Sequence, residues 1–156
     1  MCIRDSEDTV RIAKLQDLKE LQNLQIDMEH TIEDEPYPDK LGKLGVEYIL
    51  NNPEQGFYLV AENSNNIIGA LRISFERSVS RNGFFWWIQN VCVDKDYRGK
   101  GVFQKLHNEV VELAKKNKEV VAIKLHVHTN NISAIKAYEK AGMKKTPEYP
   151  YIFNLK

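Results

Sequence analysis

The order of apolar and polar positions divides the chain into alternating strands and helices. Strands are predicted where apolar residues alternate with polar ones or form a short continuous run, and helices where they recur every three or four positions. The predicted strands are Thr9–Lys14, Phe57–Glu62, Ile67–Glu76, Phe84–Val93, Val120–Val127 and Tyr149–Leu155. The predicted helices are Asp17–Met28, Asp39–Asn51, a segment from Gly101 to about Asn117, and Asn131–Gly142. This order predicts an α/β (α+β) fold in which helices pack on a sheet.

The strand Phe84–Val93 is predicted to lie inside the sheet, because its run is too aromatic and too continuous for an edge strand. Trp86 and Trp87 are consecutive, so they must point to opposite faces, and at most one can line a binding pocket. Ordinary sheet packing is the alternative for both. The polar turn Asn63–Asn66 predicts a hairpin between the two preceding strands.

Composition and charge are those of a globular protein. A chain of 156 residues fits one domain, and its 42% hydrophobic and 28% charged content disfavour disorder. The net charge is zero, so nothing attracts the chain generally to nucleic acid. The cluster Lys115, Lys116 and Lys118 is flanked by Glu112 and Glu119, which is typical of a helix end.

The chain shows no sign of a membrane or metal partner. No apolar run approaches the roughly 20 residues that span a bilayer, and the polar opening segment is not a secretory signal. No Cys/His cluster has the spacing of a metal site. We therefore expect a cytoplasmic protein without a metal.

The first six residues, Met1–Ser6, are expected to be a non-native leader. Their sequence resembles the translation of an adapter used in sequencing libraries, which places the predicted domain at residues 7–156. Cys92 is then the only native cysteine, so no structural disulfide is predicted.

The segment after Val93 combines a polar turn with two glycines that open a helix. The free N–H groups and the dipole of a helix start attract anions, and Gly99 and Gly101 let a phosphate approach the backbone closely. Arg98 and Lys100 add positive charge beside them. The segment therefore predicts a phosphate or pyrophosphate site.

Spacing excludes two common phosphate loops. A Walker loop needs Ser or Thr after its lysine, but Lys100 is followed by Gly101. A dinucleotide fingerprint needs a third glycine where Gln104 stands.

Two motifs resemble those of the GNAT superfamily of N-acetyltransferases. Arg-Gly-Lys-Gly-Val-Phe at 98–103 resembles the family's acyl-CoA motif, except that Phe103 replaces the usual Gly or Ala. The segment Asn131–Met143 is similar to the family's Asn-x-x-Ala-x-x-x-Tyr-x-x-x-Gly-Phe. The resemblance implies a GNAT-like single domain with a central mixed, mostly antiparallel sheet of six to seven strands, flanked by about four helices.

The resemblance also implies transfer of an acetyl group from acetyl-CoA to an amine, by direct attack in a ternary complex. It assigns acetyl-CoA to a set of residues that spans both motifs: Val91, Cys92, Val93, Arg98, Gly99, Lys100, Gly101, Val102, Phe103, Asn131 and Tyr138. The backbone of Val91–Val93 would pair with the pantetheine arm, and Tyr138 matches the general acid that protonates the departing thiolate. From its spacing alone, Tyr138 is better explained as a tyrosine packed on the inner face of a helix. The match to the family motif favours the general acid instead.

The resemblance does not assign the general base to a single residue. Many relatives carry an acidic residue where this chain has Gln89 and Asn90, which accept no proton near neutral pH but could order a relaying water. His128 is the preferred titratable candidate, because an ordinary histidine pKa of ~6.5 suits the task. A surface histidine is the alternative. His126 is a weaker candidate, and His107 is predicted to be solvated.

Cys92 permits a covalent acetyl-enzyme hypothesis. A small apolar residue within a strand is the simpler interpretation of the same cysteine.

The acidic segment Asp27–Asp39 lies where the family's acceptor-binding loop falls. It contains Glu33, Asp34 and Glu35 and no Lys or Arg, which predicts cationic acceptors such as polyamines, aminoglycosides or basic peptides. An ordinary solvated loop is the alternative. Asn90 is a weaker candidate for contact with the acceptor.

These observations predict an N-acetyltransferase that acts on a primary amine of a small cationic molecule. A protein or peptide N-acetyltransferase is the main alternative within the enzyme class. A non-catalytic acyl-CoA-binding module is the alternative outside it, supported by the missing acidic base and by Phe103. The resemblance also raises the expectation of a homodimer, since family members are often dimers.

Overall fold

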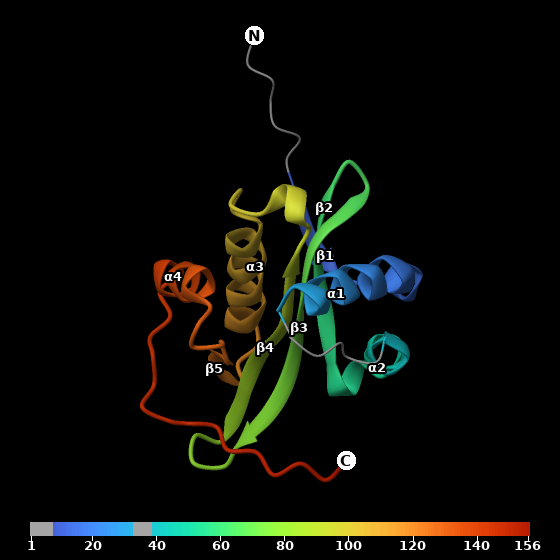
Figure 1. Ribbon diagram of the computed structural model, residues 1–156. Coiled ribbons are helices and arrows are strands. Elements are labelled where there is room, and N and C mark those ends of the chain that lie inside the picture. The colour runs from blue at the N-terminus through green and yellow to red at the C-terminus, as the bar shows by residue number, and fades with distance from the viewer. Residues whose placement is uncertain (1–7, 33–38) are drawn as a thin grey trace. The chain divides into compact units, whose positions relative to one another are not determined.

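The computed structural model describes residues 8–32 and 39–156 (Figure 1). The predicted leader Met1–Ser6 and the acidic residues Glu33, Asp34 and Glu35 lie outside these ranges. The described chain forms parts of two compact units, Met1–His126 and Val127–Lys156. Each unit is described by itself.

The first unit is built on a five-stranded sheet in the order β1-β2-β3-β4-β5. Its strands are β1 (Thr9–Ile12), β2 (Gly56–Asn63), β3 (Asn66–Ser78), β4 (Gly83–Val93) and β5 (Val120–Leu125). Strands β1 to β4 pair antiparallel, and β4 pairs with β5 in parallel. β4 therefore has a neighbour on each side, which confirms that it is not an edge strand.

A tight turn joins β2 and β3. Ser64 and Asn65 have φ values of 49° and 65°, and Asn63 pairs with Asn66 across the turn. Two-residue hairpin loops commonly need this left-handed conformation at both positions, because its twist matches that of the strands. The predicted hairpin is confirmed.

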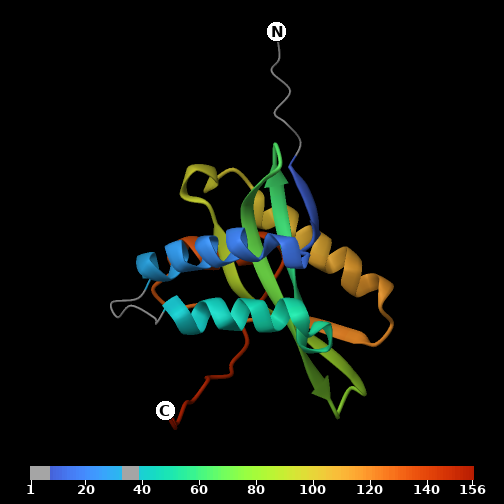
Figure 2. The same ribbon diagram turned by 90° about the vertical axis from the view of Figure 1, so that its right-hand side faces the viewer.

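Helices cover both faces of the sheet in the first unit. α1 (Leu18–Ile32) and α2 (Asp39–Asn51) lie on one face, and α3 (Val102–Lys116) lies on the other (Figure 2). Each face has its own core because successive strand residues point to opposite sides. Buried residues on the α3 side include Leu59, Leu71, Ile73, Ile88, Leu106 and Val110. Those on the α1 and α2 side include Leu21, Val46, Val60, Ala70 and Cys92.

The two tryptophans of β4 lie on opposite faces, as predicted. Trp86 is 7% exposed and belongs to the core on the α3 side. Trp87 is half-buried, and its Nε1 donates a hydrogen bond of 2.7 Å to the carboxylate of Glu76. Only Trp87 therefore remains on a partly open surface.

The predicted sheet of six to seven strands is wrong in number, because the described residues form five strands. Tyr149–Leu155 was predicted as a strand but is irregular, and Tyr151 and Phe153 are 95% and 88% exposed. Alternating apolar residues form a strand only where another strand accepts their hydrogen bonds, and Pro150 lacks the N–H that a ladder needs. α1 also continues beyond the predicted end at Met28, to Ile32.

The second unit contains one helix, α4 (Ile132–Lys140), within Val127–Lys156. Asn131 caps it, because its Oδ1 accepts a hydrogen bond of 3.1 Å from the N–H of Ala134. Gly142, with φ of 91°, follows the helix end. Both signals agree with the predicted helix bounds.

No helix in residues 8–32 and 39–156 is both long and apolar enough to cross a membrane. The same residues hold no cluster of three His, Cys, Asp or Glu side chains that could bind a metal ion.

Candidate functional site

A β-bulge interrupts β4 just before its end. Ala70 of β3 lies opposite Cys92, while Arg72 lies opposite Gln89, so two residues of β4 face the single residue Leu71. Asn90, within the bulge, has a φ of 51°. An extra residue of this kind reverses the faces to which the following side chains point and increases the local twist.

The ladder between β4 and β5 stops before this bulge, at the pair Ile88 and Leu125. The paired region of β4 and β5 therefore does not extend to Val91–Val93. A strand edge beyond the end of a ladder can pair its N–H and C=O groups with an extended ligand.

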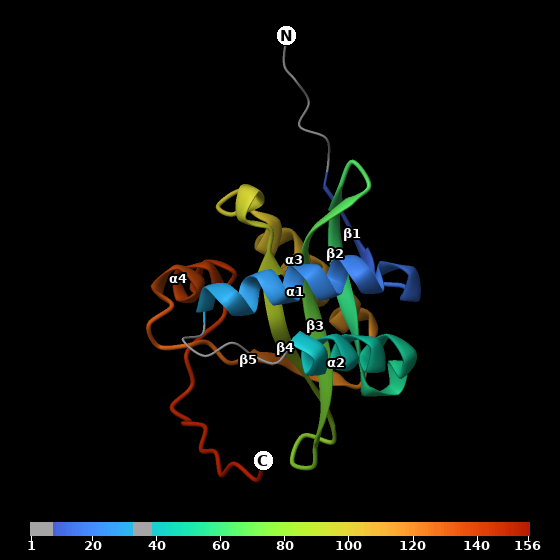
Figure 3. The same ribbon diagram turned by 45° about the vertical axis from the view of Figure 1, so that its right-hand side comes forward.

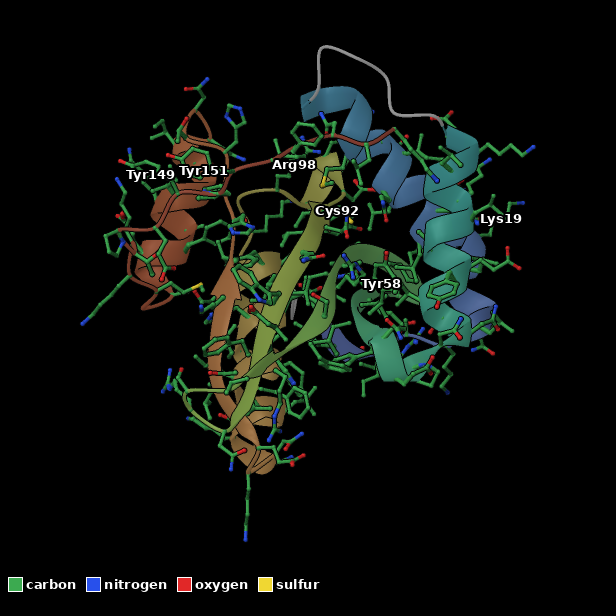
Figure 4. All side chains as sticks on the ribbon, turned by 90° about the horizontal axis from the view of Figure 1, so that it is seen from below. Lys19, Tyr58, Cys92, Arg98, Tyr149 and Tyr151 are labelled. Atoms are coloured by element: carbon green, nitrogen blue, oxygen red, sulfur yellow. The ribbon has the colours of Figure 1, made fainter. Side chains whose placement is uncertain are left out.

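The chain then turns from β4 into α3 through a short loop. The carboxylate of Asp94 accepts a hydrogen bond of 2.9 Å from the N–H of Asp96, and Arg98 Nε donates one of 3.0 Å to the carbonyl oxygen of Val93. Figure 4 shows Arg98 near Cys92, at the end of β4. Arg98 thus holds the loop to the end of the strand and keeps its charge beside the helix start.

The first turn of α3 has no cap from a side chain in the described part of the molecule. Gly101 precedes the helix with a φ of 81°, and no acidic residue stands in the first turn. The first helical hydrogen bond, 3.1 Å long, runs from the N–H of Lys105 to the carbonyl oxygen of Gly101. The first N–H groups of an α-helix have no acceptor within the helix itself, and no acidic residue in the first turn of α3 compensates the positive end of its dipole.

This arrangement fits the pyrophosphate of a coenzyme A thioester. A pyrophosphate is a compact anion that needs several donors, and the backbone at the helix start supplies them. Lys100 is exposed, with its Nζ 5.5 Å from the ring centroid of Tyr97, and adds a cation near that start.

A family model described as "Acetyltransferase (GNAT) family" matches residues 18–143. The chain belongs to the GNAT acetyltransferase family. The match covers the bulged strand, the glycine loop and both motifs, so it includes the whole candidate site. Members of this family use acetyl-CoA as the acyl donor.

Solved structures similar to this GNAT chain cover nearly all of its length. A possible acetyltransferase from Clostridium difficile 630 has a TM-score of 0.88 and 28% identity, over 95% of this chain and 97% of that one. A predicted acetyltransferase with acetyl-CoA from Clostridium acetobutylicum has a TM-score of 0.75 and 22% identity, over 94% and 96%. Glucosamine-6-phosphate N-acetyltransferase from Arabidopsis thaliana has a TM-score of 0.70 and 20% identity, over 95% and 99%. The last two likenesses show the fold alone. A search of curated proteins finds no match.

Phe103, the departure from the GNAT motif, packs along its own helix. Its ring centroid lies 5.7 Å from that of His107, one turn further on.

His107 was predicted to be solvated, which is wrong: it is 5% exposed, and burial lowers its pKa. It lies on the same side of α3 as the buried Val110, which accounts for its burial. Within the described part of the chain, the His107 Nδ1 atom has no hydrogen-bond partner.

Gln89 and Asn90, which are predicted to occupy the position of the family's acidic residue, are both held by Arg72. Arg72 Nε donates a hydrogen bond of 2.9 Å to Asn90 Oδ1, and Arg72 Nη2 donates one to Gln89 Oε1. A cation beside both amides disfavours proton uptake at this position. Sequence reasoning did not identify Arg72, although an arginine inside the apolar run Ile67–Glu76 was an available signal.

The other candidate residues for proton transfer lie in Val127–Lys156. His128 is exposed, and its Nδ1 accepts a hydrogen bond of 3.2 Å from the N–H of Asn130. Tyr138 is half-buried on α4, and burial raises the pKa of its phenol. Asn131 caps the same helix. His126 belongs to the first unit, where its ring centroid lies 4.6 Å from that of Trp87.

Cys92 does not resemble an accessible nucleophile. Its side chain is 4% exposed in the core on the α1 and α2 side, and its Sγ lies 3.8 Å from the carbonyl oxygen of Ala70. Buried thiols among apolar side chains stay protonated and react slowly. The burial of Cys92 supports the structural interpretation over a covalent acetyl-enzyme.

Proposed function

We propose that this GNAT protein transfers an acetyl group from acetyl-CoA to a primary amine of a small molecule, by direct attack within a ternary complex. Two features that follow each other in the chain carry the proposal. The first is the strand edge at Val91–Val93, which lies beyond the end of the β4–β5 ladder. The second is the start of α3, where Gly101 provides no side-chain cap. One feature suits an extended pantetheine arm, and the other suits the pyrophosphate at its end.

The proposed binding residues divide into three tasks. A backbone N–H of Val91–Val93 would polarise the thioester carbonyl. The turn from Gly99 to Phe103 would hold the pyrophosphate with backbone donors, assisted by Arg98 and Lys100. Asn131 would act by fixing the start of the helix that carries Tyr138.

Tyr138 is the proposed general acid that protonates the departing thiolate. Because burial raises the pKa of the Tyr138 phenol, it stays protonated across the physiological range and has a proton to give. His128 is the proposed base, and a water ordered by Gln89 or Asn90 is the alternative. The cation of Arg72 beside both amides weighs against that alternative.

The acceptor's charge and size are further proposals. The acidic residues Glu33, Asp34 and Glu35 support a cationic acceptor, with Asn90 as a weaker contact. A protein or peptide amine is the second candidate. A non-catalytic acyl-CoA-binding module is the third, and Phe103 with the missing acidic base supports it. A homodimer, a cytoplasmic location and the non-native leader stay predictions.

The test has two parts. Calorimetry measures acetyl-CoA binding, and thiol release from acetyl-CoA is followed with polyamines, aminoglycosides, amino acids and peptides with free amines. We expect binding, together with release that depends on one acceptor class. Arg98→Met should weaken acetyl-CoA binding, whereas the matched control Arg77→Met, on an exposed arginine of the β3–β4 hairpin, should not. Binding without release for any acceptor would favour the non-catalytic module, and absence of binding would overturn the proposal.

A further inference from the structure

Polar side chains form a row across the sheet at the bulge. Tyr58, Arg72 and Gln89 lie directly opposite one another on β2, β3 and β4. All three share the face on which α1 and α2 pack, and Tyr58 Oη donates a hydrogen bond of 3.2 Å to Gln25 Oε1 of α1. Figure 3 shows β3 and β4 continuing below α1 toward their hairpin. Arg72 is half-buried in this row, between Tyr58, which contacts α1, and the bulge in β4.

The direction of the hydrogen bonds at Arg72 is set by chemistry. A guanidinium has only donors, so Gln89 and Asn90 must turn their carbonyl oxygens toward it. Their NH2 groups consequently point away from Arg72 and remain available as donors. The row therefore presents N–H donors from two amides and from the guanidinium.

Arg72 has more N–H groups than its two hydrogen bonds use. Its two hydrogen bonds to Asn90 and Gln89 use two of about five N–H groups. No carboxylate among the described residues forms an ion pair with it. On the same face, the carboxylate of Glu76 accepts the hydrogen bond from Trp87 instead. Among the described residues, this half-buried guanidinium is held by two neutral amides, Asn90 and Gln89. Burial of a guanidinium carries a desolvation cost that an anionic ligand would offset.

The same face of the sheet carries further cations. Lys124 Nζ of β5 lies 3.9 Å from the ring centroid of Phe85 and 5.4 Å from that of Trp87. The guanidinium of Arg81 lies 5.9 Å from the ring centroid of Phe85. Lys124 pairs with Trp87, two residues from Gln89 on β4, and thus brings a cation to the same face as Arg72, which also carries the carboxylate of Glu76.

We propose that Arg72, with the NH2 groups of Gln89 and Asn90, binds a carboxylate of the acceptor, so that the acceptor is an amino acid or another small amine carrying a carboxylate. The inference rests on the proposed acetyl transfer, because it names the acceptor of that same site. The guanidinium matches a carboxylate with two parallel N–H donors. Such an acceptor carries a positively charged amine, as the acidic segment Asp27–Asp39 predicts, and a carboxylate, which would bind Arg72.

The test compares acceptors that differ only at the carboxylate. Alanine, phenylalanine and lysine are each assayed beside their carboxamides and their decarboxylated amines, with thiol release as the readout. We expect kcat/KM to be about 10- to 100-fold higher for the best free amino acid than for its two analogues, as charge-assisted hydrogen bonds predict. Equal values across a set of three, or preference for the decarboxylated amine, would overturn the inference.

Variants separate selectivity from stability. Arg72→Met should bring the preference close to 1, and Arg72→Lys should retain part of it, since the charge remains but the paired donors are lost. If Arg72 had only a structural role, Arg72→Met would lower kcat/KM equally for an amino acid, its carboxamide and its decarboxylated amine. An unchanged ratio of these values would overturn the proposal. Arg77→Met, on the same strand but the opposite face, is the matched control and should keep the wild-type ratio. Circular dichroism confirms that each variant is folded.

Equilibrium binding answers the same question without turnover. Calorimetric titration of the nine compounds into the CoA-loaded protein should show binding of free amino acids that is weakened at least tenfold by Arg72→Met. If amino acids bind in this way but no thiol is released, the proposed acetyl transfer fails and the carboxylate subsite stands. If the wild-type protein acetylates other amines and neither binds nor prefers amino acids, the subsite fails and the transferase stands.

Discussion

Gly69 of β3 leaves room for Val102, the first residue of α3. A Cβ atom at Gly69 would lie 2.7 Å from Cγ1 of Val102, closer than nonbonded carbon atoms approach. Val102 is 2% exposed, so its side chain has little space to retreat. The contact therefore sets how closely the start of α3 lies against the sheet.

We predict that Gly69→Ala displaces the start of α3. Overpacking of this kind costs about 1–3 kcal/mol of unfolding free energy, and acetyl-CoA affinity should fall because the donors at the helix start move. Chemical denaturation and calorimetry measure the two effects. The double variant Gly69→Ala/Val102→Ala removes the clash and should recover part of both losses. Additive losses in the double variant would contradict this explanation.

Gly101→Ala should weaken acetyl-CoA binding for a different reason. No heavy atom lies within 4 Å of a Cβ built there, but the φ of 81° is unfavourable for any residue with a side chain. The substitution costs about 1–2 kcal/mol, or forces the turn to change shape. Gly45→Ala is the control, since Gly45 lies inside α2 with equal space, and it should stabilise the protein by about 0.5–1 kcal/mol. Unchanged affinity in Gly101→Ala would show that the turn conformation is not needed.

Asp17 is predicted to contribute stability that is lost in acid. Its carboxylate accepts hydrogen bonds of 2.7 and 2.8 Å from Arg11, and the guanidinium of Arg11 lowers its pKa. A lowered folded-state pKa means that the contribution is complete above the unfolded value of about 3.9 and disappears as pH falls through the folded value. Asp17→Asn should therefore cost roughly 1.5–3 kcal/mol at pH 7. The difference should shrink below about pH 4.

Urea denaturation of wild type and Asp17→Asn at several pH values measures this difference. Glu54→Gln, at an exposed site, is the control and should show little change at any pH. A difference that stays constant down to pH 2 would assign the effect of Asp17 to packing rather than to its charge.

Tyr138→Phe should lower kcat and leave acetyl-CoA affinity unchanged. The substitution removes the proposed proton donor and keeps the ring. Because burial raises the pKa of the phenol, loss of the acid by ionisation should appear only above about pH 10 in the wild-type pH profile. Tyr149→Phe, an 80% exposed tyrosine of the same unit, should leave the profile unchanged. An unaltered kcat in Tyr138→Phe would remove this residue from the mechanism.

Local patterns in the sequence were sufficient for most of the backbone. The periodicity of apolar residues located α2 to the residue and β2 to β5 to within a few positions, because helices and strands expose one side to a core. Polar turns and capping residues located the hairpin at Asn63–Asn66 and the start of α4, since these signals act within a few neighbouring residues. The glycine motif likewise located the start of α3, because its conformation is encoded in the loop itself.

Tertiary structure alone decided which of these residues meet. The bulge at Asn90, the pairing of Arg72 with two amides, the burial of His107 and the irregular course of Tyr149–Leu155 depend on partners from distant segments. A strand needs another strand's hydrogen bonds, and a side chain's burial depends on what packs against it, so neither is determined by neighbours in sequence. The sequence by itself therefore determined the family, most of the elements and the glycine turn before α3, while the register of β3 against β4 decided that Arg72 meets Gln89 and Asn90.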